Sequence, residues 1–224
     1  MERLMQRLIA QAARFAASGA TPVAPRLSAT VMLLRPAPAG FEVYLLRRAV
    51  TMAFASGMYA YPGGAVEPVD YEGAPLAGDW AVQLGRPAPE AMAVVRAAVR
   101  EVAEETGVSL DPSGLRPWTR WITPEFEPRR YDTYFFVAAL PDGQRPMRLT
   151  GEADHTCWLR PAVALAQLAA GEIAMFPPTS VTLTDLAGYD AVEAVLAGAA
   201  GRDAATPILP RLQREPDGTM RFVS

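Results

Sequence analysis

The apolar positions in the first third of the chain follow the pattern of β-strands. Residues 28–34, "SATVMLL", and residues 41–48, "FEVYLLRR", are short runs rich in β-branched, aliphatic and aromatic residues. The intervening "RPAPAG" supplies the proline and glycine typical of a turn, so the two runs predict a hairpin. Residues 58–68, "MYAYPGGAVEP", predict a short extended segment running into a turn, where Gly63 and Gly64 let the backbone approach another group closely.

The middle of the chain changes to a helical pattern. A helix is expected to begin near Pro89 and to end at Gly107, because proline is favoured at the first helical position and glycine at a left-handed cap. Residues 71–88 are rich in Gly, Pro and Ala, have no clear period and are interpreted as an insertion. At 100° per residue Val95 and Val102 fall on one face of the helix, which is therefore predicted to pack on the core.

The remainder of the chain predicts three more strands and two more helices. The strands lie in "WTRWITP", "RRYDTYFFVAAL" and "HTCWL", and the helices in "PAVALAQLAAG" and in residues 180–198, with Thr179 as the cap of the second helix. No internal repeat and no linker divides the chain. We therefore expect a mixed α/β fold in a single domain that spans residues 1–224.

The first residues predict an amphipathic helix over about residues 2–17, ended by Gly19 and Pro22. The segment is poor in acids and contains Arg3, Arg7 and Arg14, so a processed leader is the alternative interpretation. The arginines interrupt each apolar run before it reaches the length of a secretory signal, and no later run approaches a membrane span. A helix that packs on the domain or on a second subunit is the favoured interpretation, which leaves a homodimer possible.

Composition and charge exclude several classes of chemistry. Half of the 224 residues are apolar, and the formal net charge of −3 argues against a nucleic-acid-binding protein. All 21 basic residues are arginine, so a Walker-type phosphate loop and a Schiff-base mechanism are excluded. The single His155 and the single Cys157 cannot build a zinc cluster or a disulfide framework, and each is expected to be structural. A reducing, cytoplasmic location is the simplest expectation.

Three acids gather near the end of the predicted central helix, where local rules disfavour them. Glu101, Glu104 and Glu105 share one side of the helix, and like charges at these spacings repel by about 0.2–0.5 kcal/mol per pair. Acids in a last turn also oppose the helix dipole, and Arg100 alone cannot neutralise all three. A divalent cation would convert this repulsion into shared coordination.

The surrounding residues resemble the Nudix box. "REVAEETGV" at residues 100–108 resembles R-E-U-x-E-E-x-G-U, with U aliphatic, at every defined position. The box begins with G-x5-E in the family, and here Gly64 is followed six residues later by Asp70, an acid one methylene shorter. The family has seven residues between that acid and the arginine, whereas this chain has 29, so an insertion of 22 residues, assigned within 71–96, splits the box.

Other segments are similar to a branch of this family related to peroxisomal coenzyme A diphosphatases. The similar stretches are "GDW", "WITP", "RRYDTYFF", "FPPTSVTL" and Glu152 ahead of Trp158. The stretch "YLLRRAVTMAFASGMYAYPGG" also partly resembles the family's coenzyme A signature, in which Gly57, Tyr61 and the glycine pair fit by spacing. The resemblance implies an α/β/α sandwich with a mixed sheet, to which N- and C-terminal helices are added.

The resemblance also implies a reaction and a set of site residues. Nudix enzymes hydrolyse a nucleoside diphosphate linked to another group, and Glu101, Glu104 and Glu105, with a carbonyl of Gly63 or Gly64, are expected to bind Mg²⁺ or Mn²⁺. Glu101 is expected to be the general base, with Glu152 as the alternative base or as a further metal ligand.

Arginines are expected to support both the box and the substrate. Arg100 is expected to orient the carboxylates and to pair with Asp70, with a plain i,i+4 pair to Glu104 as the alternative. Gly107 closes the helix. The remaining candidates are arginines whose planar forks fit phosphate oxygens, namely Arg47, Arg48, Arg129 and Arg130.

The favoured substrate from the sequence is coenzyme A or an acyl-coenzyme A. NADH and other dinucleotides, nucleotide sugars and oxidised nucleotides are the alternatives within the same chemistry. A nucleotide-sensing module without turnover is a second hypothesis, and a structural interaction protein is a third. Because all three box glutamates are present, the sequence favours a hydrolase.

Overall fold

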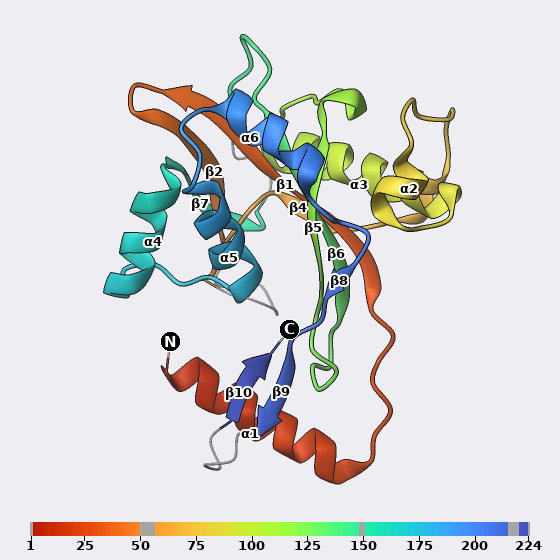
Figure 1. Ribbon diagram of the computed structural model, residues 1–224, viewed down its shortest axis with the longest axis vertical. Helices are drawn as coiled ribbons and strands as arrows, with labels where there is room; N and C mark the ends of the chain where they lie inside the picture. The colour runs from red at the N-terminus through yellow and green to blue at the C-terminus, as the bar shows by residue number, and fades with distance from the viewer. Residues whose placement is uncertain (1, 50–56, 148–150, 215–219, 224) are drawn as a thin grey trace.

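The computed structural model describes residues 2–49, 57–147, 151–214 and 220–223 (Figure 1). The N-terminal part contains α1 (Glu2–Ser18), β1 (Arg26–Ala37), β2 (Gly40–Arg48), β3 (Tyr59–Ala60), β4 (Gly63–Ala65) and the 3₁₀ turn η1 (Pro68–Tyr71). The middle contains α2 (Trp80–Leu84), α3 (Ala88–Thr106), η2 (Pro112–Gly114), β5 (Arg116–Ile122), β6 (Tyr131–Ala139) and β7 (Ala153–Leu159). The last part contains α4 (Pro161–Ala170), α5 (Pro177–Leu186), α6 (Val192–Gly198), η3 (Ala199–Gly201), β8 (Pro207–Ile208), β9 (Arg211–Arg214) and β10 (Met220–Val223).

A mixed sheet forms the centre of the fold. Its strand order is β3-β2-β1-β6-β5-β8, with β4 paired to the first half of β1 and β7 paired to β2. The β1–β6 and β5–β8 pairs are parallel, whereas β1–β2 and β5–β6 are antiparallel. Strand β1 lies at the junction of these pairings and is buried over seven consecutive residues, which explains its nearly continuous apolar sequence.

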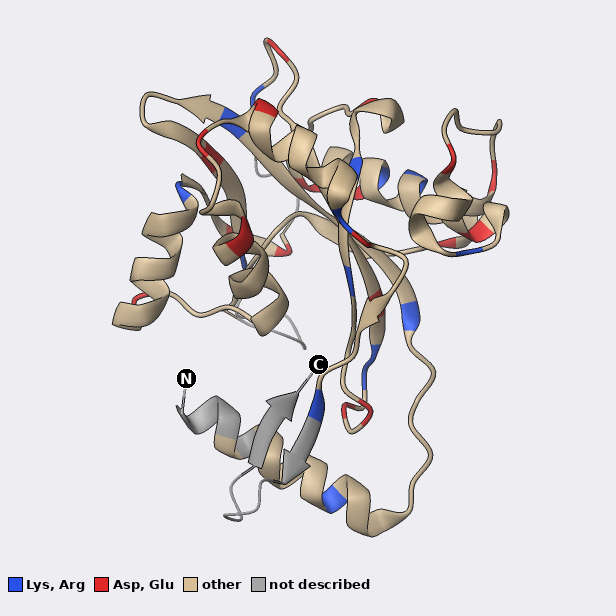
Figure 2. Cartoon of the chain, viewed as in Figure 1, with Lys and Arg blue, Asp and Glu red and all other residues tan. Residues whose placement is uncertain are grey.

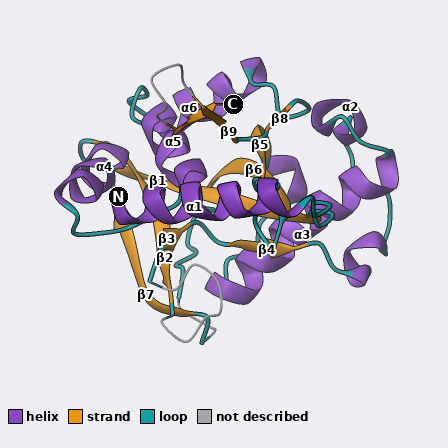
Figure 3. Ribbon diagram, turned by 90° about the horizontal axis from the view of Figure 1, so that it is seen from below, coloured by secondary structure: helices purple, strands orange, loops and turns teal. Residues whose placement is uncertain are grey.

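The two faces of the sheet carry separate apolar cores. Alternate residues of β1, such as Val31 and Leu33, face α3 in one core, while Met32 and Leu34 face α5 and α6 in the other. Figure 3 shows α3 on one side of the strands and α5 and α6 on the opposite side. The expected α/β/α sandwich with a mixed sheet is therefore confirmed.

The predicted insertion is more ordered than its composition indicated. Helix α2 forms within it, and Trp80 and Leu84 of α2 are buried in the core beneath α3. Residues 88–96, which the sequence assigned to the insertion, form the first half of α3. Helix α3 starts after Pro87 and ends at Gly107, whose φ of 74° is the left-handed cap that the sequence predicted.

One predicted helix is divided in the structure. Residues 180–198 were expected to form a single helix, but α5 and α6 are separate and the segment 187–191 between them is not helical. Thr179 was expected to cap this helix, yet it lies inside α5, whose cap is Phe176. Pro177 and Pro178 can begin the helix because the first helical N–H groups have no intrahelical acceptor to lose.

Helix α1 lies apart from the two cores. Its described side chains are all at least partly exposed, and Gln11 donates to the Phe126 carbonyl and to Glu127 at 3.3 Å each. Within the described residues, no helix combines the length and the apolar character needed to cross a membrane. Basic and acidic positions are interspersed along the described ribbon in Figure 2.

Candidate active site

The acidic end of α3 lies against the glycine turn of β4. Val95 and Val102 of α3 are fully buried in the core, as the helical period predicts. Glu101 and Glu105 lie beside this buried stripe and reach the glycines of β4, where β4 pairs with β1. Residues far apart in the sequence therefore meet at one place, with two carboxylates on the helix and a close backbone turn beside them.

Both glycines are required by the close packing of this turn. Gly63 pairs with Thr30 and Gly64 with Ala29 across the β1–β4 ladder. A Cβ atom at position 63 would overlap the Ala29 carbonyl and the Thr30 side chain, and one at position 64 would overlap the Glu101 carboxylate. The sequence anticipated a close approach here, and the structure identifies the groups that approach.

Arg100 joins the glycine turn to the helix. Its Nε and Nη2 atoms each donate to an Asp70 carboxylate oxygen at 3.0 Å, and Nη2 also donates to the Ala65 carbonyl at 3.0 Å. Its Nη1 atom donates to Glu101 at 2.9 Å and to Glu104 at 3.0 Å. Hydrogen bonding to Asp70, more than the neighbouring charges, raises the pKa of Arg100. The expected Asp70 ion pair is present, so Arg100 is more than an i,i+4 partner of Glu104.

Glu105 is the most deeply buried of the three box glutamates. It is 8% exposed, and its Oε2 atom accepts a hydrogen bond from the Gly63 N–H at 2.9 Å. Burial raises the pKa of Glu105 to about 8, against the lowering effect of the Gly63 hydrogen bond, and the Glu101 charge raises it further. Because burial disfavours the ionised Glu105 carboxylate, a cation beside it would stabilise that form.

Glu101 and Glu104 differ from Glu105 in exposure. Burial raises the pKa of Glu101, although the Arg100 charge opposes the shift. The Glu104 side chain is 54% exposed and turns toward Arg100. Glu152 lies in the turn before β7, where its carbonyl accepts from the Ala49 N–H at 2.7 Å, and its charge contributes to the raised pKa of both Glu101 and Glu105.

The donor atoms of this cluster are not drawn together around a single point. In the described part of the chain, no three acidic, histidine or cysteine side chains form a ready-made cation site. The contacts explain why, since Arg100 binds Glu101 and Glu104 while Glu105 turns to the Gly63 amide. The residue types still fit Mg²⁺ or Mn²⁺, because these are hard cations that prefer carboxylate and carbonyl oxygen. Rotation of Glu104 away from Arg100 would bring its carboxylate to the other two.

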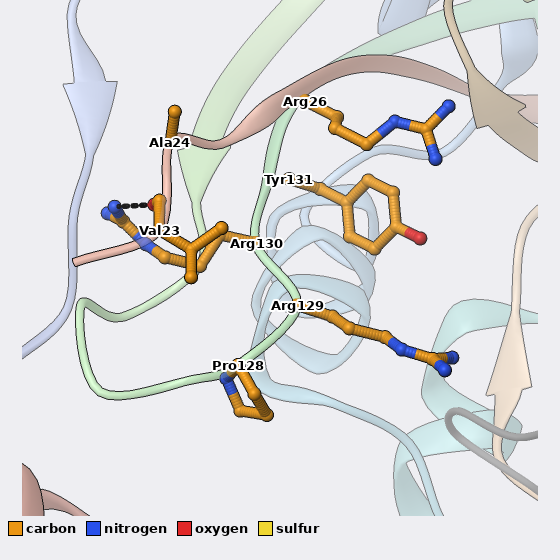
Figure 4. Close-up of a pocket in the computed structure, with 7 residues that line it drawn as sticks. All are labelled: Val23, Ala24, Arg26, Pro128, Arg129, Arg130 and Tyr131. Atoms are coloured by element: carbon orange, nitrogen blue, oxygen red, sulfur yellow. Dashed lines mark hydrogen bonds between the residues drawn. The ribbon is translucent and has the colours of Figure 1, made fainter.

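The structure places the four candidate phosphate-binding arginines in different surroundings. Arg47 pairs with Asp154 at 2.6 Å, and the Arg48 charge acts to lower the pKa of Glu105. Arg130 is buried and donates to the carbonyls of Thr123 and Val23 at 3.0 and 2.7 Å. Arg129 lies in a hollow at the start of β6 (Figure 4), beside Arg26, which the sequence interpretation did not include.

Tyr61, His155 and Cys157 each make hydrogen-bonding or packing contacts within the fold. Tyr61 is buried and its hydroxyl lies 3.0 Å from that of Thr182, which ties the glycine turn to α5. Burial raises the pKa of Tyr61. His155 packs edge-on against Tyr59, and Cys157 of β7 is partly buried. No sequence signal linked Tyr61 to Thr182, because the pairing depends on where α5 docks.

The part of the coenzyme A signature between residues 50 and 56 lies outside the described residues. Its flanking positions are described. Gly57 adopts a left-handed φ of 72°, and its N–H donates to the Arg48 carbonyl at 2.9 Å. This contact turns the chain back onto the end of β2 before it reaches the glycine pair.

Comparison with known proteins identifies the family of this arrangement. The model for the NUDIX domain matches residues 24–178, which is more than half of the chain. A Caenorhabditis elegans protein that carries the provisional name nudix hydrolase 7 is 25% identical to this chain over 180 residues. That match covers 65% of this chain and 55% of the relative, so the chain spans little more than half the length of the curated protein that it matches.

Solved structures agree with the fold. A NUDIX hydrolase from Alicyclobacillus acidocaldarius superposes with a TM-score of 0.67 at 26% identity, over 78% of this chain and 96% of that one. The NUDIX domain of Shewanella oneidensis NrtR, crystallised with ADP ribose, superposes with a TM-score of 0.52 at 15% identity, over 79% of this chain and 96% of that one. The second similarity shows the fold alone.

Proposed function

This chain belongs to the NUDIX domain family, and we propose that it is a metal-dependent diphosphatase that hydrolyses the pyrophosphate bond of a nucleoside diphosphate linked to another group. One observation carries the proposal. Two carboxylates of a single helix end, Glu101 and Glu105, contact the two glycines of one backbone turn, and a third, Glu104, accepts from the same Arg100 Nη1 atom as Glu101. Attack of water on a diphosphate requires such a cluster of oxygen ligands and little covalent chemistry from the protein.

In this proposal Glu101, Glu104 and Glu105 hold the cation, with a carbonyl of Gly63 or Gly64 as a further oxygen ligand. A bound Mg²⁺ or Mn²⁺ would neutralise diphosphate charge and lower the pKa of a coordinated water. Arg100 holds Glu101 in place from one side. The raised pKa of Glu105 in the metal-free chain has burial as its main cause, which is the state that a divalent cation relieves.

Two residues compete for the role of general base. Glu101 is held by Arg100 beside the glycine turn, and Glu152 is exposed in the turn before β7. Glu101→Gln and Glu152→Gln separate the two, with Mn²⁺ binding and kcat measured for both variants. The base is the residue whose replacement lowers kcat by about a hundredfold or more while Mn²⁺ affinity is retained. Loss of Mn²⁺ affinity instead identifies a ligand.

Coenzyme A or an acyl-coenzyme A is the substrate that we favour. Its support is the partial resemblance of residues 44–64 to a coenzyme A signature, together with arginines suited to phosphate groups. NADH, nucleotide sugars and other dinucleotides share the same reacting bond. ADP ribose also contains that bond, and for this chain it is one further candidate.

A panel of diphosphates with Mg²⁺ and with Mn²⁺, analysed by product mass, tests the function. Release of 3′,5′-ADP from coenzyme A supports the favoured substrate, and hydrolysis confined to other diphosphates replaces it. Glu104→Gln and Glu105→Gln should lower turnover by more than about a hundredfold, because a neutral amide is a weaker ligand. Glu193→Gln, which changes an exposed acid on α6, is the matched control and should leave turnover unchanged. Nucleotide binding without metal-dependent hydrolysis of any member would instead identify a sensing module.

A further inference from the structure

A hollow of about 260 Å³ lies at the start of β1, away from the acidic cluster. Its walls are Val23, Ala24 and Arg26 from the N-terminal side and residues 128–131 from the segment that leads into β6. Figure 4 shows the side chains of Arg26, Tyr131 and Arg129 extending toward the same side of this hollow. Arg130 turns the other way and donates to the Val23 carbonyl at 2.7 Å.

Within the described residues, neither of the two arginines that share the hollow has an acidic partner. Arg26 and Arg129 are exposed, and neither forms an ion pair with an acid of the described chain. Arg35, Arg47 and Arg202, which are also partly exposed, each have a carboxylate within 2.7 Å. Tyr131 lies between the two arginines in Figure 4, and each guanidinium would attract an anion that entered the hollow. The hollow therefore has the charge of an anion-binding site.

A polar strip on one face of the sheet connects this hollow with the glycine turn. Arg26, Ser28 and Thr30 alternate along β1 and so share a face. The Ser28 hydroxyl lies 2.6 Å from that of Thr133, and the Thr30 hydroxyl donates to the Pro62 carbonyl at 2.7 Å, directly before Gly63. At about 3.3 Å per residue, four residues of strand separate Arg26 from Thr30 by roughly 13 Å. An extended nucleotide and an arginine side chain together span such a distance.

We propose that Arg26 and Arg129, with Tyr131, bind a phosphate of the substrate that is separate from the diphosphate to be cleaved. The substrate class is then a nucleoside diphosphate derivative whose nucleoside carries an additional phosphoryl group. A phosphomonoester carries about 1.5 to 2 negative charges near neutral pH, and the planar guanidinium fork matches its oxygens. This inference rests on the proposed diphosphatase function, and it names the part of the substrate that the second site recognises.

Matched substrate pairs that differ by one phosphate test the inference. Suitable pairs are coenzyme A and 3′-dephospho-coenzyme A, and NADPH and NADH. The wild-type protein should show a KM at least about tenfold lower for the member with the extra phosphate in at least one pair. Arg26→Ala and Arg129→Ala should each raise that KM about tenfold to a hundredfold, leave kcat nearly unchanged, and leave the other member of the pair unaffected.

Two controls separate this site from general electrostatics. Arg129→Lys keeps the charge and loses the fork, so it should retain only part of the preference. Arg145→Ala removes an exposed arginine from a different hollow, beside Trp158, and should leave both members of each pair unchanged. The proposal would be overturned if Arg145→Ala removed the preference for the extra phosphate while Arg26→Ala and Arg129→Ala kept it. Equal KM values for both members of every pair would also overturn it.

The outcomes also separate the inference from the proposed function. If the wild-type protein hydrolyses diphosphates with the same KM whether or not the extra phosphate is present, the proposed phosphate site is wrong and the proposed diphosphatase function is supported. If no diphosphate is hydrolysed, the function fails, and competition binding with 3′,5′-ADP against 5′-AMP still tests the hollow. Tighter binding of 3′,5′-ADP that disappears in Arg26→Ala supports the site, and equal binding of the two nucleotides refutes it.

Discussion

Replacement of Asp70 by asparagine tests how the two halves of the site are held together. Asp70 is 3% exposed and its carboxylate receives two hydrogen bonds of 3.0 Å from Arg100, 30 residues later in the chain. Breaking a buried ion pair by removing one partner typically costs about 3–5 kcal/mol. Arg100 is partly exposed and keeps its bonds to Glu101 and Glu104, so the expected loss for Asp70→Asn is smaller, about 2–3 kcal/mol.

Urea unfolding and thermal unfolding of purified protein measure this loss. For a chain of this size, about 2–3 kcal/mol corresponds to a decrease in Tm of roughly 4–12 °C. Turnover should also fall, by about tenfold to a hundredfold, because Arg100, no longer fixed by the Asp70 carboxylate, positions Glu101 less firmly against the glycine turn. Asp70→Glu is the matched control, since it keeps the charge and restores the acid that the Nudix pattern has at this position.

The result that refutes this reasoning is specific. An Asp70→Asn protein within about 0.5 kcal/mol of the wild type would show that the ion pair does not stabilise the turn. Normal stability with normal turnover would remove Asp70 from the site altogether. A stability loss of the same size in Asp70→Glu would mean that the exact length of the side chain, and not its charge, is what the fold requires.

Three further predictions follow from the same structure. Gly64→Ala should abolish metal-dependent turnover without changing the circular dichroism spectrum, because the added Cβ would overlap the Glu101 carboxylate. Gly114 has open space around it, so Gly114→Ala is the control and should change neither turnover nor the spectrum. With a chelator present, the free energy of unfolding of the wild type should fall relative to that of Glu105→Gln as pH rises from about 4.5 to about 8. Over this range Glu105 keeps its proton in the folded chain and releases it in the unfolded chain. If the unfolding free energies of the two proteins, measured in urea, change with pH in parallel, the raised pKa is contradicted. Trp80→Ala in α2 should destabilise the protein by about 3–5 kcal/mol in urea unfolding, and equal stability would show that the insertion adds no core.

The site was only partly predictable from the sequence. The acids of α3, its glycine cap and the glycine turn follow local rules, so their types and spacing indicated the chemistry. The sequence placed Glu104 and Glu105 on one side of the helix and did not predict that Glu105 is buried while Glu104 is 54% exposed, because that difference depends on which elements pack over each position. Arg129 and Arg130 are adjacent in sequence, yet one faces a hollow and the other is tied to Val23 and Thr123.

The sequence by itself determined the strands, the capped helix and the family pattern, because these depend on periodicity and on residues within a few positions of one another. Tertiary structure alone decided that Trp80 enters the core and that residues 180–198 form two helices. The pairing of Asp70 with Arg100 across the insertion was expected only through the family resemblance, and the packing of η1 on α3 brings it about. The physical reason is that a helix period or a cap is a property of neighbouring residues. A buried ion pair or a shared hollow depends instead on how separate elements pack, and burial then sets the energy of each charge.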